Sequence, residues 1–449
     1  MSFREDFKWG AATASYQIEG AAYEDGRGLS IWDVFCRDGK TFKGHNGDTA
    51  CDHYHRYKGD VALMKKIGLK AYRFSVAWPR VIPNGTGMVN RKGLKFYISL
   101  LDKLNAAGIE PHITLYHWDL PYELQKKGGW LNRDIVKAYA DYVRVVVKAF
   151  GDRAKNYITF NEPQCAVVLG YRFGEHAPGW KLSKNETWIA AHNMLLAHGE
   201  AVKIIREHSA AKVGFAPLSD LHYPATDSAA DLEAAKRTYF GYVPEERDSF
   251  FNMAFFSDPV YFGEYPGFAY DNFGDSPVKQ GDFEIITRPT DYHYQNVYSG
   301  APVSAADNER GFEFADRKVG YTKTAFNWAV EPKALYYGPK FIAERYKKPI
   351  FISENGMSCH DVVSLDGKVH DPNRIDFLAR YIGELKKASA DGVDLRGYFL
   401  WSLMDNFEWA HGYNERFGII YIDFETKERV LKDSAYWYSK VIKTNGDIL

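Results

Sequence analysis

Cysteine is scarce in this sequence, and no two cysteines have the spacing of a metal site or a redox motif. The 449 residues contain four cysteines and no CxxC pair. The first ten residues, MSFREDFKWG, carry four charges and no apolar core, so they are not typical of a secretory signal. We therefore expect a cytoplasmic protein with free thiols rather than a secreted, disulfide-bonded one.

Long apolar runs, a strong net charge and low-complexity segments are also missing. No stretch reaches the ~18 apolar residues of a transmembrane helix, so no membrane span is expected. The formal net charge is −1, which gives no electrostatic reason for nucleic acid or a membrane surface as a partner. Because no linker or repeat divides the chain, we expect residues 1–449 to form one domain. A homo-oligomer is compatible with this composition.

What the sequence does contain is a series of apolar runs of strand length that alternate with helical segments. Residues 92–108, 132–151, 185–208 and 372–392 have the periodicity and end signals of helices. The strand-like runs are 7–14, 70–78, 110–118, 155–163, 212–218, 291–299, 348–356 and 395–405. Eight such units predict an α/β fold, a single-domain (β/α)8 TIM barrel with elaborated βα loops. An open doubly wound sheet is the alternative, but no GxGxxG follows the first strand.

Polar and aromatic side chains occupy the ends of these otherwise apolar runs. In a (β/α)8 barrel the carboxyl ends of the strands meet at one face, where catalytic groups stand. The residues at these positions are Arg73, His117, Trp118, Asn161, Glu162, Asn296, Tyr298, Glu354 and Trp401. Packing alone does not explain so many polar groups at equivalent positions, so we expect a functional site there.

Two of these residues, Glu162 and Glu354, supply the pair of carboxyl groups that cleavage of a glycosidic bond requires. One carboxyl group must be protonated and the other ionised, and in a retaining enzyme they lie about 5–5.5 Å apart. Arg73 and Tyr298 would hold a neighbouring carboxylate in its ionised form and so make it the nucleophile. The other glutamate, close to that negative charge, would have a raised pKa. Geometry alone leaves open which glutamate has which role.

Four motifs resemble glycoside hydrolase family 1. TFNEPQ (159–164) and FISENG (351–356) are similar to its two glutamate signatures, and ATASYQIEGA (12–21) and LWSLMDNFEW (400–409) are similar to two further blocks in the same order. The resemblance covers essentially the whole chain. It implies a β-glucosidase-like, retaining, exo-acting hydrolase that works by double displacement, without a metal or an organic cofactor. Expected substrates are small β-glucosides such as cellobiose or aryl and alkyl glucosides, as in cellulose degradation.

The resemblance also assigns roles. It implies that Glu162 is the acid/base and Glu354 the nucleophile, flanked by Arg73, Asn296 and Tyr298. The sugar-binding residues that it implies are Gln17, His117, Trp118, Asn161, Trp401, Glu408, Trp409 and Phe417. On the side of the leaving group it implies Trp328 and His176. Gln164 and Leu218 lie on the same side, at positions where the family more often has an aromatic residue and an asparagine. An indole suits the C–H face of a hexose, and carboxylates and amides suit its hydroxyls.

A 6-phospho-β-glycosidase is the main alternative within the family. That branch replaces the glutamate of FEW and brings a lysine and a tyrosine to the phosphate. This chain keeps Glu408 and has Glu415 and Phe417 at the two other positions. Carboxylates beside a phosphate dianion would repel it. We therefore expect an unphosphorylated sugar, with glucosides, galactosides and fucosides all accepted, and a transglycosylating member as a further alternative.

The sixth strand departs most from the family pattern. Residues 291–298 read DYHYQNVY, with Tyr294 where the family has glycine. A larger inward-facing side chain costs roughly 1–3 kcal/mol unless it is compensated. We expect a small residue on a neighbouring strand to make room for it.

Three other kinds of protein are weighed against a glycosidase. A Schiff-base aldolase needs a lysine at a strand end, and none of the eight runs ends with one. A metal-dependent hydrolase would have to use His53 and His55, which lack a strand-end carboxylate partner. A sugar-binding barrel without activity would lack Glu162 or Glu354, and both are present.

Overall fold

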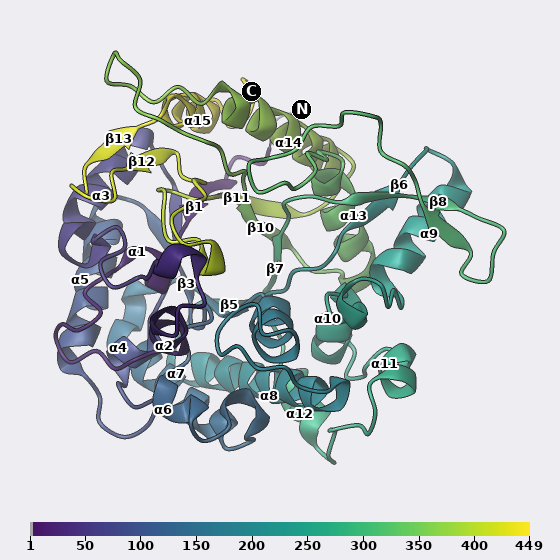
Figure 1. Ribbon diagram of the computed structural model, residues 1–449, viewed down its shortest axis with the longest axis horizontal. Helices are drawn as coiled ribbons and strands as arrows, with labels where there is room; N and C mark the ends of the chain where they lie inside the picture. The colour runs from purple at the N-terminus through teal and green to yellow at the C-terminus, as the bar shows by residue number, and fades with distance from the viewer. Residues whose placement is uncertain (1–2) are drawn as a thin grey trace.

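Eight parallel strands form a closed barrel in a computed structural model that describes residues 3–449 (Figure 1). Their order around the barrel is β1, β11, β10, β7, β5, β4, β3 and β2. The strands are β1 (Lys8–Ala12), β2 (Ala71–Ser75), β3 (Glu110–Thr114), β4 (Asn156–Asn161), β5 (Lys212–Ala216), β7 (Tyr292–Asn296), β10 (Ile350–Asn355) and β11 (Leu395–Trp401). Each lies within one of the predicted strand-like runs, so the predicted (β/α)8 barrel is confirmed.

Long helices surround this barrel, and the four helical segments named from the sequence are among them (Figure 1). Asn90 caps the first of these four, and Ser183 and Glu186 form a capping box at the start of the longest. The long helices are α3 (His53–Ile67), α5 (Arg91–Ala106), α7 (Ile135–Phe150), α8 (Lys184–His208), α13 (Ala334–Tyr346), α14 (Pro372–Ala390) and α15 (Asp433–Lys443). Their apolar faces pack on the strands and produce one core that extends from Phe3 to Ile442.

The loops between strands and helices contain further elements that the sequence did not reveal. Short strands form a three-stranded sheet, β6 (His222–Pro224), β8 (Ala301–Ala305) and β9 (Phe312–Phe314), and a pair, β12 (Ile420–Ile422) and β13 (Arg429–Leu431). The remaining α-helices are α1 (Ser15–Ile18), α2 (Ile31–Arg37), α4 (Trp78–Val81), α6 (Tyr122–Gln125), α9 (Ala229–Phe240), α10 (Met253–Tyr261), α11 (Gly267–Asn272) and α12 (Asp282–Ile286). The short 3-10 helices are η1 (Phe42–Gly44), η2 (Gly129–Leu131), η3 (Gly151–Arg153), η5 (Arg247–Ser249) and η6 (Trp409–His411), and η4 (Cys165–Arg172) is a π-helix. Most are too short to show a hydrophobic period.

The unusual tyrosine of the sixth barrel strand is accommodated by a glycine, as expected. Tyr294 is fully buried and packs over Gly214 of the neighbouring strand β5. A Cβ atom at Gly214 would lie 2.5 Å from the Tyr294 ring. The ring also stacks on Phe351 of β10, and its hydroxyl hydrogen-bonds with Nδ1 of His112 at 3.0 Å. The predicted small residue on an adjacent strand is therefore Gly214.

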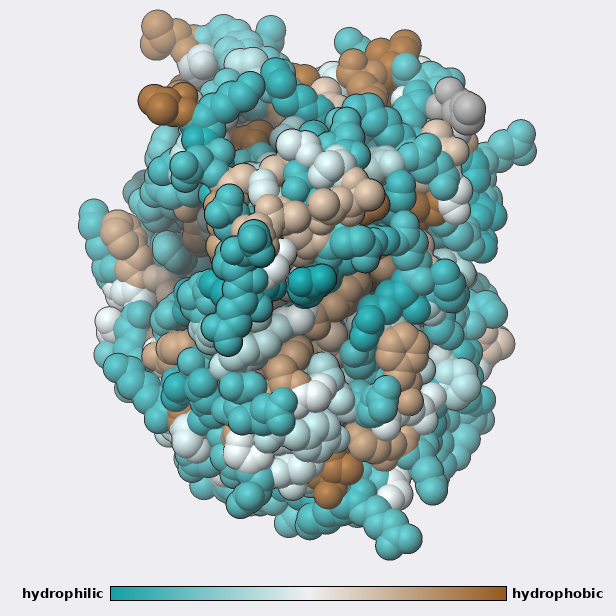
Figure 2. Space-filling view, turned by 90° about the vertical axis from the view of Figure 1, so that its right-hand side faces the viewer, coloured by the Kyte–Doolittle hydropathy of each residue, from teal (hydrophilic) through white to brown (hydrophobic). Residues whose placement is uncertain are grey.

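The outer face that carries α9, α11 and β8 is mostly hydrophilic, with hydrophobic side chains scattered between polar ones (Figure 2). Within residues 3–449 no helix is both long and apolar enough to cross a membrane.

Candidate active site

A cavity of about 510 Å³ opens at the carboxyl ends of the barrel strands, where the sequence predicted a site. Its volume lies within the range of small-molecule sites. Most of the predicted site residues line it: His117, Trp118, Glu162, His176, Leu218, Asn296, Tyr298, Trp328, Glu354, Trp401, Glu408, Trp409 and Phe417.

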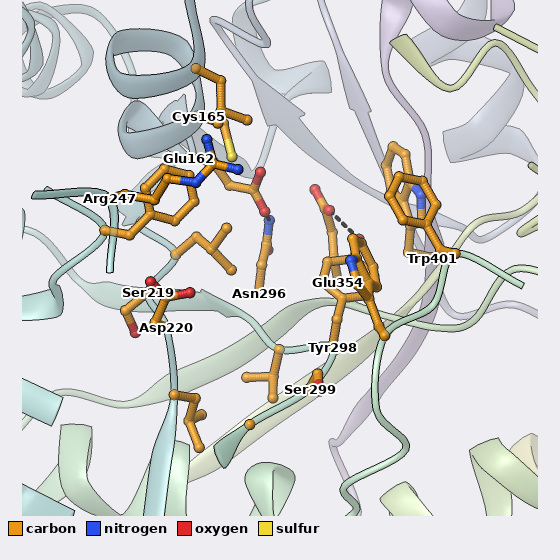
Figure 3. A pocket seen from close by; sticks show the side chains of 18 of the residues that line it. Glu162, Cys165, Ser219, Asp220, Arg247, Asn296, Tyr298, Ser299, Glu354 and Trp401 are labelled. Carbon is orange, nitrogen blue, oxygen red and sulfur yellow. Dashed lines mark hydrogen bonds between the residues drawn. The ribbon is translucent and has the colours of Figure 1, made fainter. Parts of the chain in front are cut away.

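Glu162 and Glu354 extend into this cavity from opposite sides, and their carboxyl groups face each other (Figure 3). Glu162 follows β4 directly and Glu354 lies on β10. The pairing of β10 with β7 shifts register between Ile352 and Glu354. Such irregularities redirect side chains next to active sites. Both glutamates are almost completely buried, at 5% and 3% exposure.

The Glu354 carboxylate has two strong hydrogen-bond donors. Nη1 of Arg73 on β2 lies 2.5 Å from Oε1, and the hydroxyl of Tyr298 lies 2.6 Å from Oε2. Burial raises the pKa of Glu354 above its ordinary value, and the charge of Arg73 and these hydrogen bonds oppose that rise. The two donors therefore favour the ionised form of this carboxyl group.

The Glu162 carboxyl group has no cation among its contacts in residues 3–449. Nδ2 of Asn296 donates to its Oε1 at 2.7 Å. Burial, and then the nearby charge of Glu354, raise the pKa of Glu162 to about 8. Two facing carboxyl groups thus have unequal surroundings, one suited to the ionised form and the other to the protonated form.

A layer of buried side chains holds the two glutamates and Asn296 in place. Nη2 of Arg73 donates to Oδ1 of Asn161 at 2.6 Å, and Nδ2 of Asn161 donates to Nε2 of His117 at 3.0 Å. The hydroxyl of Ser353 donates to Oδ1 of Asn296 at 2.6 Å. Burial and the charge of Arg73 hold the pKa of His117 well below its ordinary value, so this ring is neutral.

The wall beside Glu354 combines flat aromatic rings with a further carboxyl group. The His117 ring is nearly parallel to both Trp401 and Trp409, with centroids 6.0 and 5.8 Å apart. Nε2 of Gln17 donates to Oε2 of Glu408 at 3.3 Å. Burial and the charge of Glu354 raise the pKa of Glu408 well above its ordinary value. Rings next to hydrogen-bonding groups match the two faces of a sugar.

Comparisons with known proteins agree with this geometry. Residues 1–447 match Glycosyl hydrolase family 1. The chain belongs to glycosyl hydrolase family 1. It is 45% identical to beta-glucosidase A of Thermotoga maritima, over 99% of this chain and 98% of the relative. It is 39% identical to a bifunctional beta-D-glucosidase/beta-D-fucosidase of Bifidobacterium breve, over 98% of both chains.

Among solved structures, a Thermotoga maritima beta-glucosidase in complex with galacto-hydroximolactam superposes with a TM-score of 0.90. It shares 45% sequence identity, and the match covers 99% of each chain. The predicted family is confirmed, and the protein is a glycoside hydrolase as predicted.

Four predicted residues of this family 1 hydrolase lie behind the cavity lining rather than in it: Arg73, Gln17, Asn161 and Gln164. The first three hold lining residues through the hydrogen bonds described above. Gln164 is fully buried, and its Oε1 accepts a hydrogen bond from the backbone nitrogen of Leu218 at 3.1 Å. Its side-chain oxygen is therefore directed toward the backbone that follows β5.

Three residues of the site have backbone angles that side chains rarely adopt. Trp118, Glu162 and Trp409 have φ values of 76°, 41° and 50°. Positive φ at residues other than glycine concentrates at functional sites, where the surrounding structure enforces it. In the hydrolase Glu162 directly follows β4, Trp118 lies four residues after the end of β3, and Trp409 opens η6 in the segment after β11. All three side chains line the cavity.

The side of the cavity opposite Trp401 contains residues that the sequence did not single out (Figure 3). They include Cys165, Ser219, Asp220, Glu246 and Arg247. Burial and the charge of Glu246 raise the pKa of Asp220 to about 7. Most lie in long loops without a family motif, which is why they were missed. Cys165, three residues after Glu162, and Asp220, two after Leu218, were the two that position relative to a motif could have indicated.

A metal-dependent hydrolase would use His53 and His55, and a Schiff-base enzyme would use a lysine in the cavity. His53 hydrogen-bonds with Asp60 at 2.7 Å, and His55 hydrogen-bonds with Asp52 and Glu24, so the two rings have separate partners. No lysine is among the residues that line the cavity between 3 and 449.

Proposed function

We propose that this family 1 hydrolase is a retaining, exo-acting β-glucosidase that cleaves terminal nonreducing β-D-glucosyl residues. One observation carries the proposal: of two facing buried carboxyl groups, Glu354 has Arg73 and Tyr298 as partners and Glu162 has an amide. Retaining hydrolysis requires this division between an ionised nucleophile and a protonated acid. The beta-glucosidase activity of the Thermotoga maritima relative agrees with it.

In the first step, Glu354 attacks the anomeric carbon and Glu162 gives its proton to the departing oxygen. Because Nδ2 of Asn296 occupies Oε1 of Glu162, the proton belongs on Oε2. The raised pKa of Glu162, about 8, keeps this group protonated at neutral pH. The carbon–oxygen bond to the leaving group breaks as the bond to Glu354 forms, which gives a covalent glycosyl-enzyme.

In the second step, water replaces the enzyme at the anomeric carbon. Glu162, now a carboxylate, takes a proton from this water, and Glu354 departs as a carboxylate. Arg73 and Tyr298 stabilise the negative charge that returns to Glu354. The neutralisation of Glu354 in the intermediate also removes the charge that raised the pKa of Glu162, so the same group works as acid and then as base.

The sugar side supports a hexose without a phosphate group. Glu408, held by Gln17, would accept hydrogen bonds from O4 and O6, and Trp401 would lie under the C–H face. The charge of Glu415 also raises the pKa of Glu408, so a second carboxylate stands near it and opposes a phosphate dianion. The bifunctional relative and the complex with galacto-hydroximolactam support acceptance of fucosides and galactosides beside glucosides.

Further parts of the proposal concern substrates and setting. We propose cellobiose and aryl or alkyl β-glucosides as substrates, with a place in cellulose degradation. The leaving group would contact Trp328, Leu218 and His176. Residues 1–449 would form one catalytic domain, which the continuous core supports. The free state of all four cysteines supports a cytoplasmic location.

The decisive experiment separates the two glutamates. Glu354→Gln should abolish hydrolysis of an aryl β-glucoside while far-UV circular dichroism stays that of the parent; more than a few per cent of the parent activity would refute the nucleophile role. Glu162→Ala should lose most activity on substrates with poor leaving groups, and azide should restore turnover with an activated aryl glucoside by forming the β-glucosyl azide. A product of α configuration would refute the retaining mechanism.

A further inference from the structure

Cys165 is a cavity residue that the proposed reaction does not use. It lies in the first turn of η4, three residues after Glu162, and it is 5% exposed. The amide nitrogen of the next residue, Ala166, donates to the carbonyl oxygen of Glu162, which ties this turn to the glutamate. The sulfur atom of Cys165 points toward the carboxyl group of Glu162 (Figure 3), and both residues line the cavity.

We propose that Cys165 is a positioning residue for Glu162, whose S–H group donates a hydrogen bond to that carboxylate once it has lost its proton. The thiol supplies a second donor besides Nδ2 of Asn296. A donor stabilises a carboxylate more than the neutral acid. The contact is therefore strongest in the glycosyl-enzyme, where Glu162 must accept a proton from water. This inference rests on the acid/base role proposed for Glu162.

The thiol acts as a donor because it stays protonated. Burial and the charge of Glu162 raise the pKa of Cys165 well above the ordinary value of a thiol. In the proposed arrangement, donation by the thiol lowers the pKa of Glu162, as donation by Asn296 does, against the opposing effects of burial and Glu354. A purely apolar side chain of the same size would fill the space without this effect.

Charged and titratable groups on other elements also face Glu162 and Cys165 and affect their pKa values. They are Arg73 on β2, Glu354 on β10, Tyr298 after β7, Glu408 after β11 and Arg247 at η5. A substitution at Cys165 changes none of these groups. A change in the titration of Glu162 in such a variant therefore reports on the thiol itself.

Two variants of nearly equal size separate donation from packing. Cys165→Ala removes the donor, so the basic limb of kcat/KM should move to higher pH by about half a pH unit. Cys165→Ser supplies a stronger donor, so the limb should move to lower pH. The measurement is the pH profile of kcat/KM for phenyl β-glucoside, whose poor leaving group makes protonation by Glu162 necessary. Cys359→Ala is the matched control, because Cys359 does not line the cavity within the described chain.

The outcomes distinguish this inference from the proposed function. The role of Cys165 would be overturned if the basic limb of kcat/KM in both variants stayed within the scatter of the control. It would also be overturned if the limb moved in the same direction in both variants. A parent enzyme without a basic limb, or a Glu162→Ala variant with parent activity, would instead overturn the role of Glu162. The serine variant differs from the parent by one atom and keeps the inference testable if the alanine variant folds poorly.

Discussion

Replacing Tyr298 by phenylalanine removes the hydroxyl that donates to Oε2 of Glu354 at 2.6 Å and leaves the partly buried ring in place. In the second step Glu354 departs as a carboxylate, so the hydrogen bond strengthens as negative charge returns. A hydrogen bond to a charged group contributes about 1.5–3 kcal/mol. Its loss should slow release of the sugar by roughly 10- to 150-fold.

The assay uses 2,4-dinitrophenyl β-glucoside. Because its leaving group departs without being protonated, hydrolysis of the glycosyl-enzyme limits kcat. Tyr298→Phe should lower kcat by that factor and give a burst of dinitrophenol equal to the enzyme concentration. The acidic limb of kcat/KM should move to higher pH, because the hydroxyl lowers the pKa of Glu354. Tyr294→Phe, which removes the β7 hydroxyl that contacts His112, should change neither quantity. An unchanged kcat and no burst would refute the stabilising role of Tyr298.

Three further predictions address the acid, the leaving group and the barrel. The basic limb of the parent kcat/KM profile should lie at about pH 8, because Glu162 has a raised pKa. A profile that is flat from pH 6 to 9 in a stopped assay would contradict this prediction. Asp220→Asn should raise KM for cellobiose several-fold but change KM for an aryl glucoside less than twofold, because this carboxyl group lines the leaving-group side and suits sugar hydroxyls; equal effects on both would count against it. Gly214→Ala should lower the free energy of unfolding in urea by roughly 1–3 kcal/mol. The same substitution should cost less in a protein that already carries Tyr294→Ala, and an equal cost in both backgrounds would show that the two sites do not touch.

The barrel itself was predictable because its strands carry a strong signal. Each is buried on both sides by the interior and the helices, so it reads as a continuous apolar run with a turn at its end. The family motifs also lie at the strand ends, which is where the structure has Glu162 and Glu354. Even the compensation for Tyr294 followed from volume alone, although only the structure identified Gly214.

The loops were not predictable in the same way. The sheet of β6, β8 and β9 joins residues 222–224 to residues 301–314, and strands of three to five residues set no detectable period. The leaving-group side of the cavity depends on these loops, so Ser219, Asp220, Glu246 and Arg247 escaped notice. Gln164 illustrates the reverse case, because a residue next to a motif was expected at the cavity and instead supports the backbone of Leu218.

The serine of FISENG shows how one strand can set both carboxyl groups. Alternation along a strand would direct Ser353 and Glu354 to opposite faces, but the register of β10 against β7 shifts between Ile352 and Glu354. The hydroxyl of Ser353 can then donate to Oδ1 of Asn296 at 2.6 Å. An amide whose oxygen accepts from serine must direct its NH2 group elsewhere, and here Nδ2 lies 2.7 Å from Oε1 of Glu162. The strand that carries the nucleophile therefore also fixes, through Ser353 and Asn296, which oxygen of the acid is free to hold the proton.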